Sequence, residues 1–130
     1  MSAPALKNVL YVDDDADIRE IVQMSLSLDG ELCVDLCDGG ERALARMRAE
    51  RPDLVMLDVM MPGMDGPSIL AHMRADERLR HIPVIFMTAK TNSSEVARFR
   101  GLPAIGVIAK PFDPMELGSQ VRTLWKSHHE

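Results

Sequence analysis

The chain has 130 residues, of which 46% are hydrophobic and 27% charged, a composition typical of one compact globular domain. Its formal net charge of −5 offers nucleic acid no attractive field, and no apolar run approaches the roughly 20 residues that span a bilayer. Residues 1–7 lack the apolar stretch of a secretory signal. We therefore expect a cytoplasmic protein with neither a nucleic-acid partner nor a membrane partner.

Short apolar runs alternate with amphipathic segments along the whole chain. In chain order they predict strand 9–12, helix 16–28, strand 32–36, a helix marked by Ala43, Leu44 and Met47 that ends before Pro52, strand 54–57, a short helix around 69–74, strand 83–87, a weakly indicated helix at 93–100, strand 105–109 and a helix carrying Leu117, Val121, Leu124 and Trp125. This alternation predicts an α/β fold with helices on both faces of a five-stranded parallel sheet. No linker or repeat divides the chain, so we expect one domain over residues 1–130.

Chemically active side chains follow four of the predicted strands. Asp13 and Asp14 follow the first, Asp58 the third, Thr88 the fourth and Lys110 the fifth. Ligands of open α/β folds bind at the carboxyl ends of the strands. If the first and third strands are neighbours, three carboxylates share one pocket, and Lys110 alone does not balance their charge. A hard divalent cation would balance it, and a few carboxylates with several waters suit Mg²⁺.

Such a pocket suits phosphoryl transfer to a carboxylate. A metal ion and Lys110 can neutralise charge on the phosphoryl oxygens while Asp58 attacks in line. The Thr88 hydroxyl can donate a hydrogen bond to a phosphoryl oxygen. The residues therefore indicate a site for a transient acyl phosphate.

From about Asn8 to Trp125, the chain resembles the receiver domain of bacterial two-component response regulators. Four motifs carry the resemblance, each at a predicted strand end and in the family's order: VLYVDDD at 9–15, LDVMMPGMDG at 57–66, MTA at 87–89 and KPF at 110–112. The resemblance implies a doubly wound, flavodoxin-like (βα)5 fold with sheet order 2-1-3-4-5. It also implies a signalling phosphoacceptor that promotes its own phosphorylation and slow dephosphorylation, without being an enzyme in the usual sense.

The resemblance assigns the acidic residues by position. Asp58 matches the family's phosphoacceptor. Asp13 and Asp14 match the acidic pair that holds Mg²⁺ together with Asp58 and the backbone carbonyl of Met60. These four positions are the expected metal ligands.

The resemblance also assigns the residues that respond to the phosphoryl group. Lys110 matches the lysine that contacts it, and the bond from Lys110 to Pro111 is expected to be cis. Thr88 matches the hydroxyl that shifts toward the phosphoryl group on activation. Val107 stands where many receivers carry an aromatic switch residue, so this part of the usual signal path is missing.

The expected partners follow from the same resemblance. The phosphoryl group would come from a phosphohistidine of a histidine kinase or a histidine phosphotransfer protein. Because the chain stops after the last predicted helix, we expect no output domain and a signal passed by protein contact. The face formed by the fourth helix, fifth strand and fifth helix, near Arg98 and Arg100, is the expected contact surface, in a monomer or a phosphorylation-dependent dimer.

Three other functions compete with this one. A phosphatase of the haloacid dehalogenase type needs a second aspartate two residues after the nucleophile, where this chain has Met60. A flavin or nucleotide binder needs phosphate-binding donors after the first strand, where this chain has Asp13-Asp14-Asp15. A degenerate receiver that only binds protein is disfavoured by the intact pair of Asp58 and Lys110.

The remaining candidates have ordinary structural interpretations. Asp15 and Asp17 are expected to cap a helix. Cys33 and Cys37 lie four residues apart on one strand, about 13 Å from each other and too far for a disulfide, so we expect two buried free thiols. His72 and His81 lie away from the predicted strand ends and are expected at the surface.

Overall fold

A computed structural model describes residues 4–89 and 104–129 of the chain. The elements in this part are β1 (Asn8–Val12), α1 (Ala16–Ser27), β2 (Cys33–Cys37), α2 (Gly40–Ala49), β3 (Leu54–Asp58), α3 (Gly66–Ala75), β4 (Val84–Thr88), β5 (Gly106–Ala109) and α5 (Leu117–His128). The helix predicted at 93–100 lies outside the described residues. Every other predicted element is present, with ends shifted by a few residues.

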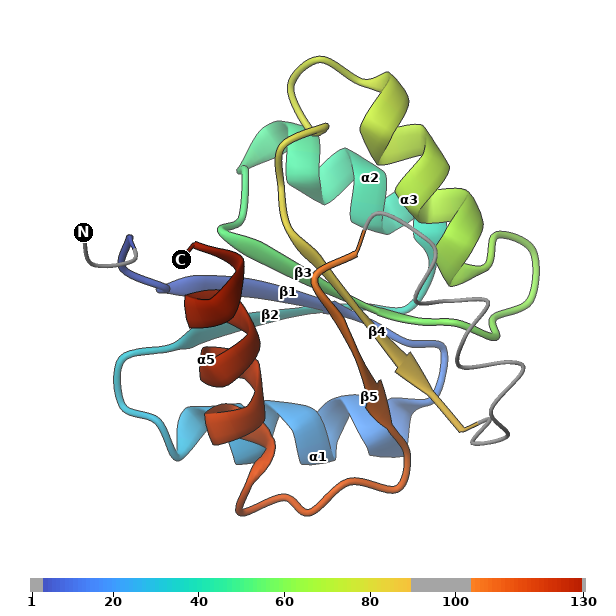
Figure 1. The fold of residues 1–130 in the computed structure, drawn as a ribbon. Helices are drawn as coiled ribbons and strands as arrows, with labels where there is room; N and C mark the ends of the chain where they lie inside the picture. The colour runs from blue at the N-terminus through green and yellow to red at the C-terminus, as the bar shows by residue number, and fades with distance from the viewer. Residues whose placement is uncertain (1–3, 90–103, 130) are drawn as a thin grey trace.

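The strands form one parallel sheet in the order β2-β1-β3-β4-β5. Helices α2 and α3 cover one face, and α1 and α5 cover the other (Figure 1). This confirms the predicted flavodoxin-like fold. The central strands β3 and β4 are buried along their whole length, which explains why they read as continuous apolar runs.

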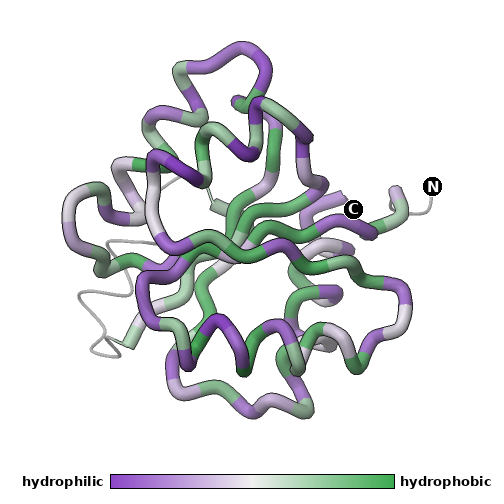
Figure 2. The backbone as a smooth tube through the Cα atoms, turned by 180° about the vertical axis from the view of Figure 1, so that it is seen from behind, coloured by the Kyte–Doolittle hydropathy of each residue, from purple (hydrophilic) through white to green (hydrophobic). Residues whose placement is uncertain are grey.

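Alternate residues of each strand face opposite layers of the core. On β1, Leu10 and Val12 belong to the apolar cluster beneath α2 and α3, whereas Val9 and Tyr11 belong to the cluster beneath α1 and α5. Figure 2 shows that hydrophobic residues are concentrated along the central strands, whereas much of the periphery is hydrophilic. The two-residue period therefore decides which layer each side chain at a strand end will face.

Two aspartates mark the starts of helices that flank the strand ends. The carboxylate of Asp15 accepts from the backbone N–H groups of Asp17 and Ile18 and caps α1, as predicted. Asp65 accepts from the Ser68 N–H and caps α3. Because of this cap and a proline in the first turn, α3 begins at Gly66, about one turn earlier than its apolar residues indicated.

The prediction of two buried thiols is wrong for Cys33. Both cysteines are free, but only Cys37 is buried, and Cys33 is exposed. The reason is the place of β2 at the edge of the sheet, where Cys33 is the first residue of the strand. Burial raises the pKa of the Cys37 thiol, which further reduces its share of reactive thiolate.

We expect a thiol reagent to label the native protein rapidly at one cysteine only. The rapid phase should disappear in Cys33→Ser and remain in Cys37→Ser, because the exposed thiol supplies it. Absorbance of the released chromophore, measured before and after addition of denaturant, gives both rates. Two equally fast thiols in the native protein would contradict this assignment.

Candidate functional site

Backbone pairing brings the predicted site residues to one edge of the sheet. β1 and β3 are direct neighbours, as the convergence of their acidic ends requires. The ladder continues past the strands, since the Asp13 N–H donates to the Cys37 carbonyl at 3.1 Å and the Lys110 N–H donates to the Thr88 carbonyl at 2.7 Å. Together with the pairing of β1 with β3, β3 with β4 and β4 with β5, these bonds hold the carboxyl ends of the strands in fixed register.

Three carboxylates meet at this edge. Asp13, Asp14 and Asp58 each offer an oxygen, and these oxygens lie within 4.8 Å of one another. Asp13 and Asp58 are buried, whereas Asp14 is exposed and opens the cluster to solvent. Hard oxygen ligands in a compact group, accessible from one side, fit a divalent cation that keeps several waters.

Lys110 lies between the two buried carboxylates. Its Nζ donates to Asp13 Oδ2 at 2.8 Å and to Asp58 Oδ1 at 3.0 Å. Burial opposes the charged ammonium, but the hydrogen bonds to the two aspartates outweigh it and raise the pKa of Lys110. The peptide bond from Lys110 to Pro111 is cis, as predicted. Lys110 is therefore a permanent cation in the site.

The two buried carboxyls differ in electrostatic environment. Burial raises the pKa of Asp58, and the nearby Asp13 charge adds to this increase, while the single bond from Lys110 only partly offsets it. Burial acts on Asp13 too, but bonds from Lys110, Tyr11 and the Asp15 N–H lower its pKa overall. The negative charge on Asp58 is thus the less well compensated of the two.

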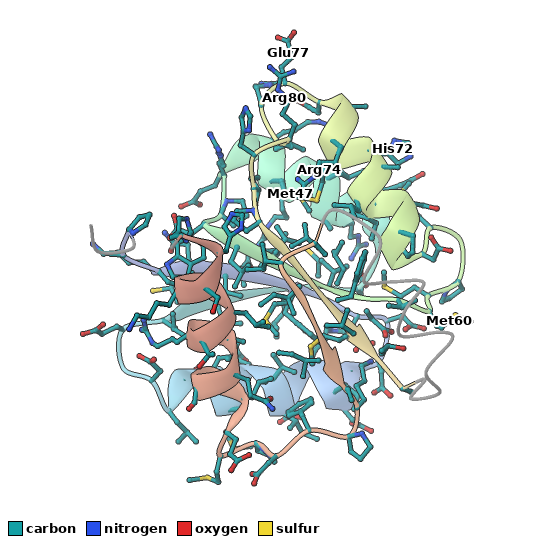
Figure 3. All side chains as sticks on the ribbon, in the orientation of Figure 1. Met47, Met60, His72, Arg74, Glu77 and Arg80 are labelled. Carbon is teal, nitrogen blue, oxygen red and sulfur yellow. The ribbon has the colours of Figure 1, made fainter. Side chains whose placement is uncertain are left out.

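The loop after β3 is held close to Asp58 by backbone contacts. The Gly66 N–H donates to the Val59 carbonyl at 3.0 Å. A Cβ atom at Gly66 would lie 2.6 Å from the Asp58 carbonyl oxygen, so only glycine fits here without movement. Met60, on the same loop, is exposed and points outward at the rim of the molecule (Figure 3).

The other residues singled out from the sequence lie on separate segments: Thr88, Val107, His72 and His81. Thr88 is buried at the end of β4, one residue beyond Met87, the register partner of Asp58. Val107 on β5 is half-buried and packs against the core cluster beneath α2 and α3. His72 and His81 are exposed, as predicted, and Figure 3 shows His72 on the outer side of α3.

Two contacts of Asp13 were not predicted from the sequence. The Tyr11 hydroxyl donates to Asp13 Oδ2 at 2.7 Å, and Arg19 Nη1 donates to the Asp13 backbone carbonyl at 2.7 Å. The contact of Tyr11 with Asp13 could have been predicted, because residues two apart along a strand share a face. Arg19 gave no such signal, since its contact depends on how α1 packs against the sheet.

A family model described as the response regulator receiver domain matches residues 9–122. This chain belongs to the response regulator receiver domain family. As a receiver domain, it is a phosphoacceptor module of two-component signalling, and histidine kinases are the partners of such modules. The cluster of Asp13, Asp14 and Asp58 is the acidic pocket typical of the magnesium site in receivers.

Named relatives agree with this placement. The DNA-binding response regulator MtrA of Mycobacterium leprae is 39% identical over 116 residues, which are 89% of this chain and 50% of MtrA. The probable transcriptional regulator ycf27 of Porphyridium aerugineum is 36% identical over 118 residues, or 91% of this chain and 48% of the relative. The receiver chain thus spans about half the length of the curated relatives it matches.

Solved receivers have the same fold. The chemotaxis protein CheY4 of Vibrio cholerae superimposes with a TM-score of 0.82 at 29% identity, covering 92% of this chain and 99% of CheY4. The receiver domain of the Francisella response regulator 1452 gives a TM-score of 0.82 at 26% identity, covering 94% and 98% of the two chains. In the part of this receiver that the structure describes, no helix is long and apolar enough to cross a membrane.

Proposed function

We propose that Asp58 is the phosphoacceptor of this receiver and that a phosphohistidine of a histidine kinase or a histidine phosphotransfer protein is the donor. The observation that carries the proposal is the position of Asp58. Its carboxylate lies beside two further carboxylates, and its Oδ1 accepts from Lys110 Nζ at 3.0 Å. We propose that an oxygen of Asp58 attacks phosphorus. Asp13, by contrast, is already bonded to Tyr11, Lys110 and the Asp15 N–H.

The proposed transfer moves one phosphoryl group between two nucleophiles. A carboxylate oxygen of Asp58 forms a bond to phosphorus while the bond from phosphorus to the donor imidazole nitrogen breaks. The leaving imidazole keeps the electron pair and takes a proton from solvent. Lys110 supplies positive charge to the phosphoryl oxygens, and the buried hydroxyl of Thr88 supplies a hydrogen bond.

The proposed metal is Mg²⁺, held by Asp13, Asp14, Asp58 and the backbone carbonyl of Met60. Burial chiefly raises the pKa of Asp58 and the nearby Asp13 charge raises it further, and Lys110 only partly offsets both, so a second cation would favour the ionised carboxylate. Bound Mg²⁺ would supply the missing positive charge at the phosphoryl oxygens. Asp14, the exposed member of the cluster, faces the side from which an ion and its waters can enter.

The proposed output is contact with another protein through β5 and α5, together with residues of the predicted fourth helix. A surface groove along these elements is lined by residues that include Val107, Phe112, Glu116, Gln120 and Leu124. Because Val107 has little rotamer freedom, we propose that the signal reaches this groove through movement of Thr88 and the backbone of β5. Since receiver domains are usually cytoplasmic, the cytoplasm is the proposed location.

Phosphorylation from a small donor tests the assignment. We expect acetyl phosphate with Mg²⁺ to add one acid-stable, base-labile phosphoryl group, which requires Asp58 and is measured as a gain in intact mass. Asp58→Asn should gain none, because the amide is a far weaker nucleophile. Addition of EDTA should prevent labelling of the wild type.

Asp38→Asn is the matched control for that experiment. Asp38 also follows a strand, β2, but it is exposed and bonds Arg42 at the surface. This variant should be labelled like the wild type. Stable labelling of Asp58→Asn, or the absence of labelling in the wild type, would refute the assignment of Asp58.

A further inference from the structure

Tyr11 is the only tyrosine of the chain, and its side chain is completely buried. It lies on the central strand β1, two residues before Asp13, and its ring packs in the core cluster beneath α1 and α5. The ring thus fills the core, while the hydroxyl reaches the end of the strand and donates to Asp13 Oδ2 at 2.7 Å. A phenylalanine would fill the same space without that bond, so core packing alone does not require the hydroxyl.

The hydrogen bonds to Asp13 limit how this carboxylate can bind a metal. An ionised carboxylate has about four acceptor sites, two on each oxygen. Oδ2 accepts from both Tyr11 and Lys110, at 2.7 and 2.8 Å. Oδ1 accepts from the Asp15 N–H at 3.0 Å. Among the described residues, one acceptor site therefore remains, and it lies on Oδ1.

We propose that Tyr11 is a positioning residue for the metal site, whose hydroxyl fixes the Asp13 carboxylate so that Oδ1 alone is presented to Mg²⁺. This inference rests on the magnesium site proposed above. The Tyr11 hydroxyl bonds Oδ2 of Asp13, and the Asp15 N–H bonds Oδ1. Because both oxygens are held, the carboxylate cannot rotate to offer both of them to the ion. Donors that orient a metal ligand in this way commonly contribute a large part of the metal affinity.

The same bond has a second consequence once Asp58 carries a phosphoryl group. Lys110 uses two of its three N–H donors on the two aspartates, and turning further toward a phosphoryl oxygen would lengthen or break one of these bonds. If it leaves Asp13, then Oδ2 of this nearly inaccessible side chain keeps only the Tyr11 hydroxyl as donor. A buried carboxylate oxygen without a donor is costly. Tyr11 therefore allows Lys110 to move while Asp13 stays in place.

Mg²⁺ affinity of Tyr11→Phe, measured by titration calorimetry, tests the inference. We expect an affinity about 10-fold weaker than that of the wild type, the usual loss when a bond behind a metal ligand is removed. Ile85→Val is the matched control, because Ile85 is fully buried in the same core cluster as Tyr11 and the change removes one methyl without touching a polar group. It should bind Mg²⁺ like the wild type.

A second measurement needs no variant. Labelling tyrosine at the ring carbon that bears the hydroxyl gives one NMR signal, that of Tyr11. This signal should shift as Mg²⁺ is added, and the midpoint of the shift should match the midpoint measured by calorimetry. The indole N–H of Trp125, which donates to the carbonyl of Pro4 in the segment before β1, should not shift. Equal affinity of wild type and Tyr11→Phe, or a tyrosine signal unmoved by saturating Mg²⁺, would overturn the role of Tyr11. A wild type that binds no Mg²⁺ would overturn the metal site itself and this inference with it.

Discussion

Lys110→Met is expected to lower the free energy of unfolding by about 3 kcal/mol at neutral pH without Mg²⁺, because breaking a buried ion pair leaves charge uncompensated. Lys110 is the cation bonded to both Asp13 and Asp58, and its side chain is only 14% exposed. Methionine keeps most of the side-chain volume and removes the charge. The two carboxylates would then repel each other inside the protein. Urea unfolding followed by circular dichroism measures the loss.

The stability difference between wild type and Lys110→Met should shrink as the pH falls. In the wild type the pKa of Asp13 is lowered, so its contribution to stability is present above the unfolded pKa and is lost as the pH falls through the folded one. Without Lys110, both carboxyls would have folded pKa values above their unfolded values. Protonation would then favour the folded variant, so wild type and variant should approach each other in stability toward about pH 4.

Mg²⁺ and a surface lysine provide the controls. Added Mg²⁺ should still bind Lys110→Met and should stabilise it more than the wild type, because the ion replaces the lost positive charge. The phosphorylation-induced change in structure should weaken, since no lysine is left to contact the phosphoryl group. Lys126→Met, on the exposed side of α5, should change none of these properties. A pH-independent loss of stability would show that the charge of Lys110 is not its cause.

Gly66→Ala is expected to lower the free energy of unfolding by about 2 kcal/mol, in the range for overpacked positions. The new methyl group would lie 2.6 Å from the Asp58 carbonyl oxygen and 3.1 Å from the Val59 Cα. Both are backbone atoms, so the start of α3 or the end of β3 must move. Because the clash falls on the backbone of Asp58, Mg²⁺-dependent phosphorylation should slow as well, which a time course of intact mass measures.

Gly118→Ala is the matched control for this prediction. Gly118 also lies in the first turn of a helix, α5, but an added methyl group would have no neighbour within 4 Å. Alanine has the higher helix propensity, so this variant should be as stable as the wild type or slightly more stable. If both variants lost the same free energy, the close approach to Asp58 could not be the reason.

Much of the fold could be predicted because its signals are local. Continuous apolar runs identified the buried strands, and the spacing of apolar residues identified the helices. Asp13, Asp58, Thr88 and Lys110 could be identified from their positions at strand ends, because parallel strands bring their carboxyl ends to one edge. The cap at Asp15 depends on neighbours only two and three residues away, so it too could be read from the sequence.

Other properties were decided by contacts between distant segments. The exposure of Cys33 results from the edge position of β2, and periodicity within a strand does not encode which strand lies at an edge. The close approach of Gly66 to Asp58 depends on how the loop after β3 folds back. Likewise, Val107 was known from the sequence to lack an aromatic ring, but its packing against the core beneath α2 and α3 is visible only in the structure.

The acidic pocket shows both kinds of information. That three carboxylates and one lysine would meet could be read from the order of residues, since each of them stands at the end of a strand. How these groups share charge depends on the tertiary fold, in which Asp13 receives three donors whereas Asp58 depends on Lys110. Hydrogen bonds require distances of about 3 Å, and such distances are set by side-chain packing across the sheet rather than by the order of residues along the chain.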